Sequence, residues 1–143
     1  MNYEIVFENS HIVVVDKPHG WLPTPAREAN DPRPCLGRDL QTQLKQQIFP
    51  VHRLDFEVSG VVMFVKTKEA HRDTQKWFEE GTIQKTYQAL SGVFGDLSEW
   101  KNWQEWKSRI ARGKKRAFEG AHGKEALTKA RVVLEENKLW RWE

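Results

Sequence analysis

The stretch of sequence that decides the fold is VHRLDFEVSGVVMFV, residues 51–65. Residues 51–55 have an extended pattern, and residues 56–60 have the composition of a loop. Residues 61–65 form a continuous apolar run, which predicts a fully buried strand. Asp55 is therefore expected at a strand end that faces a loop, where proteins commonly present functional groups.

Three further elements are predicted on the N-terminal side of this stretch. Two short β-branched runs, residues 5–7 and 12–15, predict strands joined by a tight turn. Residues 21–34 contain four prolines and little periodicity, which indicates an irregular surface loop. Apolar residues then recur every fourth position from Leu36 to Ile48, which predicts an amphipathic helix that Pro50 ends.

On the C-terminal side, Thr67 can cap a helix that Gly81 ends. The apolar face of that helix would consist of Ala70, Trp77 and Phe78. We expect a strand over residues 83–93, with Lys85 and Tyr87 on one face, and a final strand pair at residues 126–135 and 138–143. Strands thus dominate over two clear helices without a βαβ series. The predicted fold class is α+β, with a mixed, mostly antiparallel sheet flanked by helices.

Length and composition restrict the function further. A chain of 143 residues predicts one domain, residues 1–143, and a net charge of +3 favours polyanionic partners only weakly. Neither a long apolar run nor a basic signal-peptide start occurs, so we expect a cytoplasmic protein without a membrane span. With Cys35 as the single cysteine and scattered histidines, neither a disulfide nor a metal or other cofactor is expected.

Positive charge is concentrated between Lys101 and Arg116, where seven Lys/Arg residues accompany one acid. These cations fit either a phosphate-binding surface or a solvated loop. The candidates for RNA contact are Arg109, Arg112, Lys114, Lys115 and Arg116. Trp100, Trp103 and Trp106 precede them with a spacing that favours the buried stripe of a helix over a base-stacking platform.

Asp55 and Tyr87 also have ordinary structural interpretations. An aspartate at a strand end is more often a turn or ion-pair residue than a catalyst, and an extended segment would place Arg53 and Asp55 on one face as a pair. A tyrosine in a strand is usually a half-buried packing residue. Residue types alone therefore leave both the structural and the catalytic interpretation open.

Three stretches together are more specific than any single residue. They are IVVVDKPHG at residues 12–20, HRLD at residues 52–55 followed by Ser59-Gly60, and IQKTY at residues 83–87, with GKEALT at 123–128 as a weaker fourth. In this order and spacing the chain resembles the RluA-type family of RNA pseudouridine synthases. The resemblance extends from the N-terminus to about Thr128.

This resemblance implies a pseudouridine synthase catalytic domain that isomerises uridines of tRNA or rRNA without a cofactor or an obligate protein partner. Asp55 would be the essential catalytic carboxylate. Tyr87 would pack on the target uracil and take part in its final deprotonation, and Arg53 would hold the flipped-out RNA. Lys17, with its neighbours, would form a structural turn. Val58 departs from the threonine that is more common in the family before Ser-Gly.

The chemistry explains why these residue types are needed. The glycosidic bond must break and a carbon–carbon bond must form to the same sugar, and an ionised carboxylate can serve as nucleophile or as base toward the ribose. A nearby cation is needed to keep an enclosed carboxylate charged. The target base must also leave its stack, and an aromatic ring can replace its neighbours.

In the family, a later segment with Gly-Arg-x-His-Gln supplies an arginine that pairs with the catalytic aspartate, and this sequence does not contain it. We therefore expect that the C-terminal part of the domain is missing and that the chain as given is inactive. A natural protein with an intact mass of 16.8 kDa would contradict this expectation. The alternatives are a non-catalytic RNA-binding module and a nucleoside hydrolase that acts through Asp55 with water.

Overall fold

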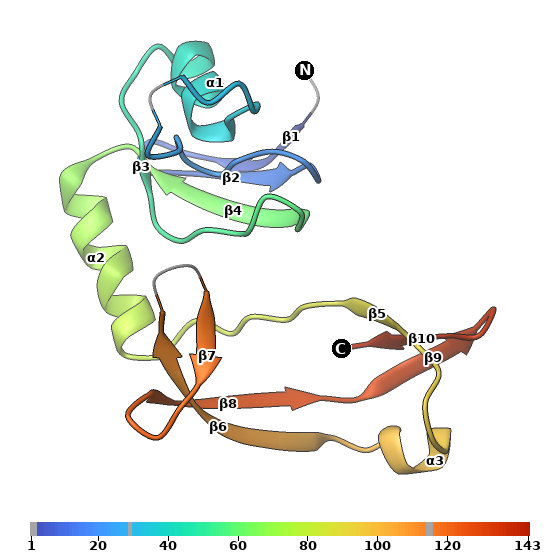
Figure 1. Ribbon diagram of the computed structural model, residues 1–143. Helices are drawn as coiled ribbons and strands as arrows, with labels where there is room; N and C mark the ends of the chain where they lie inside the picture. Colours follow the sequence, from blue (N-terminus) through green and yellow to red (C-terminus); the bar gives the residue numbers. More distant parts are fainter. Residues whose placement is uncertain (1–2, 29, 114–115) are drawn as a thin grey trace. The chain divides into compact units, whose positions relative to one another are not determined.

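A computed structural model describes residues 3–28, 30–113 and 116–143 (Figure 1). Lys114 and Lys115, two of the predicted RNA-contacting residues, lie outside these ranges. The chain forms two compact units, Met1–Gln84 and Lys85–Glu143. That residues 1–143 make up one catalytic domain stays a prediction.

The first unit is a four-stranded antiparallel sheet with two helices (Figure 1). Its elements are β1 (Glu4–Glu8), β2 (Ile12–Lys17), α1 (Leu36–Leu44), β3 (Phe49–Pro50), β4 (Gly60–Val65) and α2 (Lys68–Glu79), with strand order β1-β2-β4-β3. The predicted tight turn between β1 and β2 is confirmed. The Asn9 side-chain oxygen accepts hydrogen bonds from the backbone N–H groups of His11 and Ile12, both at 2.8 Å.

The core of this unit lies between α1 and one face of the sheet. It consists of Val13, Val15, Leu36, Leu40, Ile48, Val62 and Phe64. Alternate residues of β2 and β4 point into it, because successive side chains of a strand face opposite sides. The prediction that residues 61–65 are fully buried was therefore wrong, since the Val61 side chain is 58% exposed.

The segment between α1 and β4 also differs from the prediction. Helix α1 ends at Leu44, because Lys45 adopts a left-handed conformation with φ 51°. Ile48 is buried in the core without being helical. The strand predicted at residues 51–55 is instead the short β3, and residues 51–55 are irregular. After β3, the Val51 N–H donates to the Met63 carbonyl at 3.1 Å, and the Met63 N–H donates to the His52 Nε2 atom at 3.2 Å instead of to a backbone carbonyl.

Helix α2 confirms the predicted start and end. The Thr67 hydroxyl accepts a hydrogen bond from the Ala70 N–H at 3.1 Å, and Gly81, with φ 68°, follows the helix end. On the packed side, the fully buried residue is Thr74, whose hydroxyl donates to the Ala70 carbonyl. The predicted apolar face of α2 is therefore only partly buried, since the Trp77 side chain at its end is exposed.

Thr67→Ala should lower the free energy of unfolding of the first unit by about 1 kcal/mol, because it leaves a helix N-terminal N–H without its acceptor. Urea unfolding, followed through the amide NMR signals of residues 3–84, would measure the change. Thr42→Ala is a matched control, since the exposed Thr42 hydroxyl donates to a carbonyl inside α1 and caps nothing. Equal losses for the two variants would contradict the cap assignment.

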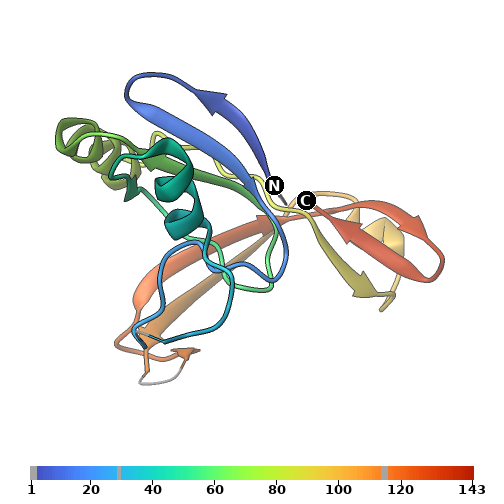
Figure 2. The ribbon, with the colours of Figure 1, turned by 90° about the horizontal axis from the view of Figure 1, so that it is seen from above.

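The second unit contains two three-stranded antiparallel sheets and a short helix (Figure 2). Its elements are β5 (Ala89–Gly92), α3 (Leu97–Trp100), β6 (Gln104–Arg112), β7 (Ala117–Glu119), β8 (Lys124–Ala130), β9 (Val132–Glu136) and β10 (Leu139–Trp142), with sheet orders β5-β10-β9 and β7-β6-β8. β9 and β10 form a hairpin whose two turn residues, Asn137 and Lys138, both have positive φ, as a type I′ turn requires.

Two strand predictions for this unit were wrong in extent. The strand expected over residues 83–93 is only β5, because β10 supplies partners only from Gly92 to Ala89. The strand expected over residues 126–135 is divided between β8 and β9, which belong to different sheets. The α+β class and the antiparallel pairing are nevertheless confirmed, with one isolated parallel bridge between Leu22 and Cys35.

A cluster of aromatic rings surrounds the buried Trp140 of the second unit. Its members are Phe94, Trp100, Trp106, Trp140 and Trp142, with neighbouring ring centroids 5.0–6.4 Å apart. The predicted helical tryptophan stripe was wrong: Trp100 ends α3, whereas Trp106 lies in β6. Residues from different elements meet here because burying rings together removes a large apolar area from water.

Candidate functional site

Asp55 lies in an irregular loop of the first unit, not at the strand end that was predicted. Its side chain is exposed, and the following turn is closed by a hydrogen bond from the Val58 N–H to the Asp55 carbonyl at 3.2 Å. The neighbouring Leu54 side chain is half-buried and packs against the core. This anchor leaves the carboxylate directed at solvent while the backbone is held.

Lys17, at the end of β2, holds the other side of this loop. Its side chain is 0% exposed, and Nζ donates to the carbonyls of Trp21 (2.7 Å), Pro18 (3.0 Å) and Phe56 (3.4 Å). Burial lowers the pKa of Lys17, whereas the charges of Glu57 and Asp55 act in the opposite direction. The ammonium group is therefore a structural cation beside Asp55, in agreement with the turn role expected for this motif.

Further contacts join the loop of residues 18–34 to the backbone just after Asp55. The Gly20 N–H donates to the Phe56 carbonyl at 2.9 Å, and the His19 Nδ1 atom lies 2.6 Å from the Glu57 carbonyl oxygen. The His19 side chain is exposed to solvent apart from this contact. Phe56 thus receives contacts from several points of the preceding loop.

Arg33 supplies one of these contacts, with its guanidinium carbon 5.1 Å from the centroid of the Phe56 ring. The Asp31 carboxylate binds the Arg33 guanidinium through two hydrogen bonds. Arg33 Nη2 donates to Oδ2 at 2.6 Å, and Nε donates to Oδ1 at 3.0 Å. These hydrogen bonds lower the pKa of Asp31 to about 2. Sequence reasoning missed Arg33; the only signal was the Asp-Pro-Arg spacing within a proline-rich loop.

Arg53 is exposed beside Asp55. Among residues 3–28, 30–113 and 116–143, no ion pair joins the two side chains, so the structural pair considered from sequence is absent. The reason is that residues 51–55 are not a strand, and strand alternation therefore does not set the directions of these side chains. Arg53 is available to a ligand.

Tyr87 belongs to the second unit and lies in the irregular segment before β5. Its side chain is 55% exposed, which contradicts the ordinary interpretation of a packed strand tyrosine. The tyrosine ring is therefore accessible on its own unit.

The predicted basic residues are divided between different surroundings. Arg109 and Arg112 lie three residues apart in β6 and thus on opposite faces of the strand. Arg109 forms an ion pair with Glu125 at 3.2 Å and donates to the Ala121 carbonyl. Arg112 and Arg116 are exposed near the β6–β7 turn. The basic run in the sequence is consequently not one continuous patch on β6.

Among the residues that the structure describes, no group of three or more His, Cys, Asp or Glu side chains is placed to hold a metal ion. No helix in this part of the chain is both long and apolar enough to cross a membrane.

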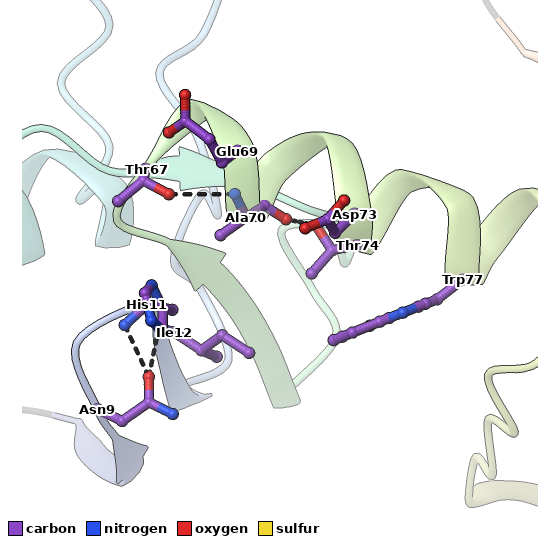
Figure 3. A pocket seen from close by; sticks show the side chains of 9 residues that line it. All are labelled: Asn9, His11, Ile12, Thr67, Glu69, Ala70, Asp73, Thr74 and Trp77. Atoms are coloured by element: carbon purple, nitrogen blue, oxygen red, sulfur yellow. Dashed lines mark hydrogen bonds between the residues drawn. The ribbon is translucent and has the colours of Figure 1, made fainter.

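A hollow of the first unit lies between the β1–β2 turn and α2 (Figure 3). Its lining residues are Asn9, His11, Ile12, Thr67, Glu69, Ala70, Asp73, Thr74 and Trp77. Neither Asp55 nor Arg53 contributes to it. It is therefore separate from the candidate catalytic loop.

Comparison with known proteins identifies the family. The family model described as RNA pseudouridylate synthase matches residues 11–143. This chain belongs to that family. The resemblance to RluA-type synthases is confirmed by a dual-specificity RNA pseudouridine synthase RluA from Pasteurella multocida, 32% identical over 126 residues, covering 78% of this chain and 54% of the relative.

A second curated relative and a solved structure also belong to the pseudouridine synthases. A tRNA pseudouridine synthase C from Yersinia pestis is 34% identical over 87 residues, covering 61% of this chain and 34% of the relative. The solved structure of human RNA pseudouridylate synthase domain containing 1 has a TM-score of 0.73 at 20% identity, covering 99% of this chain and 58% of that chain. The latter likeness confirms the pseudouridine synthase fold. The chain spans about half or less of the curated relatives it matches.

Proposed function

We propose that the protein carrying this chain converts specific uridines of tRNA or rRNA into pseudouridine, with Asp55 as the essential catalytic residue. The observation that carries the proposal is an exposed carboxylate, within the HRLD motif of the family, on a loop held from both sides by Leu54 and Lys17. The names of the relatives, which specify tRNA or dual-specificity RNA, support RNA as the substrate class.

The reaction is an isomerisation that needs no external reactant. The bond between uracil N1 and ribose C1′ breaks, uracil C5 bonds to C1′, and the proton on C5 is lost while N1 gains one. Asp55 acts on the ribose as an ionised carboxylate. Tyr87 packs on the extruded uracil and takes part in the deprotonation, and its exposed ring supports that role.

RNA binding involves cations from both units. Arg53 holds the flipped-out nucleotide beside Asp55, and Arg109, Arg112 and Arg116, together with Lys114 and Lys115, contact phosphates. Their combined charge makes binding depend on salt, because each phosphate contact releases counterions. Arg112 is a clearer phosphate ligand than Arg109, since it is exposed and forms no ion pair within the described residues.

The natural protein, incubated with unmodified tRNA and rRNA, should produce pseudouridine at defined positions in nucleotide-resolution mapping. RNA binding without pseudouridine would instead favour a non-catalytic RNA-binding module. Release of free uracil would show that Asp55 supports hydrolysis. Either of these results would overturn the synthase proposal.

Arg112→Gln should flatten the dependence of log K on log salt concentration by about 0.7–1 unit, the contribution of one phosphate contact. Arg109→Gln is the comparison within the same set of cations. It should change the slope less, because Glu125 already offsets the Arg109 charge. Fluorescence anisotropy with labelled RNA at several salt concentrations would measure both slopes. Unchanged slopes in both variants would show that RNA does not contact β6.

A further inference from the structure

Arg33 presents a flat, fixed surface next to the candidate catalytic loop. Its guanidinium carbon lies over the Phe56 ring, 5.1 Å from the ring centroid. The Arg33 side chain is 45% exposed, so its remaining surface is open to solvent. Phe56 follows Asp55 directly in the chain, so Arg33 contacts the side chain of the residue next to Asp55 in the sequence.

The Asp31 carboxylate fixes the plane of this guanidinium. Nε and Nη2 of Arg33 donate to both carboxylate oxygens, at 3.0 Å, 3.2 Å and 2.6 Å, and the Arg33 backbone N–H also donates to Asp31, at 3.0 Å. Asp31 itself has a side chain only 10% exposed. A planar group held by two parallel hydrogen bonds loses little conformational entropy when a ligand stacks on it.

The ion pair between Arg33 and Asp31 also determines which part of an RNA this surface can bind. Asp31 offsets the positive charge of Arg33, so a phosphate gains little electrostatic attraction there. The ion pair with Asp31 leaves the solvent-exposed part of the guanidinium uncovered. Unstacked RNA bases commonly stack on arginine guanidinium planes and on aromatic rings. The chemistry therefore favours a nucleobase over a phosphate.

We propose that Arg33, supported by Phe56 and Asp31, is a stacking platform for the base next to the target uridine. This inference rests on the proposed function. A nucleotide whose uracil is extruded leaves its neighbour without a stacking partner, and the platform replaces that partner beside Asp55. Stacking of this kind tolerates any base, because every base has a π face.

The test compares Arg33→Lys, which keeps the charge but removes the plane, with Arg72→Lys as matched control. Arg72 is exposed on α2 and pairs with Glu69, so the chemical change is the same. The probe is a single-stranded RNA with one uridine between two 2-aminopurines, whose fluorescence falls on stacking. We expect quenching by the natural protein and by Arg72→Lys. Arg33→Lys should bind at least about fivefold more weakly, with most of the quenching lost.

A second variant separates a lost platform from a disturbed loop. Asp31→Asn leaves the Arg33 guanidinium in place but offers it one acceptor oxygen instead of two, so it should lose less of the quenching than Arg33→Lys. Loss of quenching in Asp31→Asn but not in Arg33→Lys, or equal quenching by Arg33→Lys and Arg72→Lys, would overturn the platform. A natural protein that forms pseudouridine without quenching the probe overturns the platform alone. One that neither binds nor modifies RNA overturns the platform and the proposed function together.

Discussion

Asp55→Asn is expected to reduce pseudouridine formation by about 10³-fold or more, the largest effect of any substitution considered. Asparagine has nearly the same shape as aspartate but cannot carry the negative charge, so it acts neither as nucleophile nor as base. Quantitative mapping of pseudouridine after timed incubation of the natural protein with RNA would measure the loss.

Asp73→Asn is the matched control for this substitution. Asp73 is an exposed aspartate of the same unit, on α2, and it lines the separate hollow shown in Figure 3. It should leave pseudouridine formation unchanged. Because the Asp55 side chain is exposed, Asp55→Asn should also leave the unfolding free energy within about 0.5 kcal/mol of the unsubstituted protein. Full activity in Asp55→Asn would refute the site assignment.

Lys17→Met should lower the free energy of unfolding of the first unit by about 3 kcal/mol. Methionine fills a similar volume but donates no hydrogen bond, so the carbonyls of Pro18, Trp21 and Phe56 lose their shared donor in a buried position. Hydrogen bonds from a charged donor contribute more than neutral ones, which makes this the largest stability effect predicted here.

Urea unfolding, followed through the amide NMR signals of residues 3–84, would measure that loss. Lys76→Met is the matched control, because Lys76 is exposed in the last turn of α2. It should change the free energy of unfolding by no more than about 0.5 kcal/mol. A similar small change for Lys17→Met would mean that the carbonyls of Pro18 and Trp21 find other donors, as the Phe56 carbonyl already has the Gly20 N–H.

Short-range patterns predicted those elements whose cause is local. The Thr67 cap and the β1–β2 turn depend on side chains within three residues of the backbone groups they bind. The ordered motifs around Lys17, Asp55 and Tyr87 were sufficient to predict the family, which the match over residues 11–143 confirms.

Apolar spacing gave wrong helix predictions where the apolar residues are buried by contacts between different elements. Ile48 continues the four-residue spacing of α1 because it is buried in the same core, although the helix ends at Leu44. Trp100 and Trp106 have a helix-like spacing, but they meet through stacking between α3 and β6, with ring centroids 6.0 Å apart. Periodicity records which residues are buried and does not by itself record the path of the backbone between them.

By itself the sequence determined the family and the α+β class, because these depend on the order of residues along the chain. The catalytic role of Asp55 is a prediction from the same order. Only the tertiary structure decided what surrounds Asp55. The Lys17 ammonium reaches Phe56 across 39 positions, and Arg33 covers the ring of that same residue. Such contacts arise when loops without periodicity fold against one another to satisfy buried polar groups, and no local pattern encodes them.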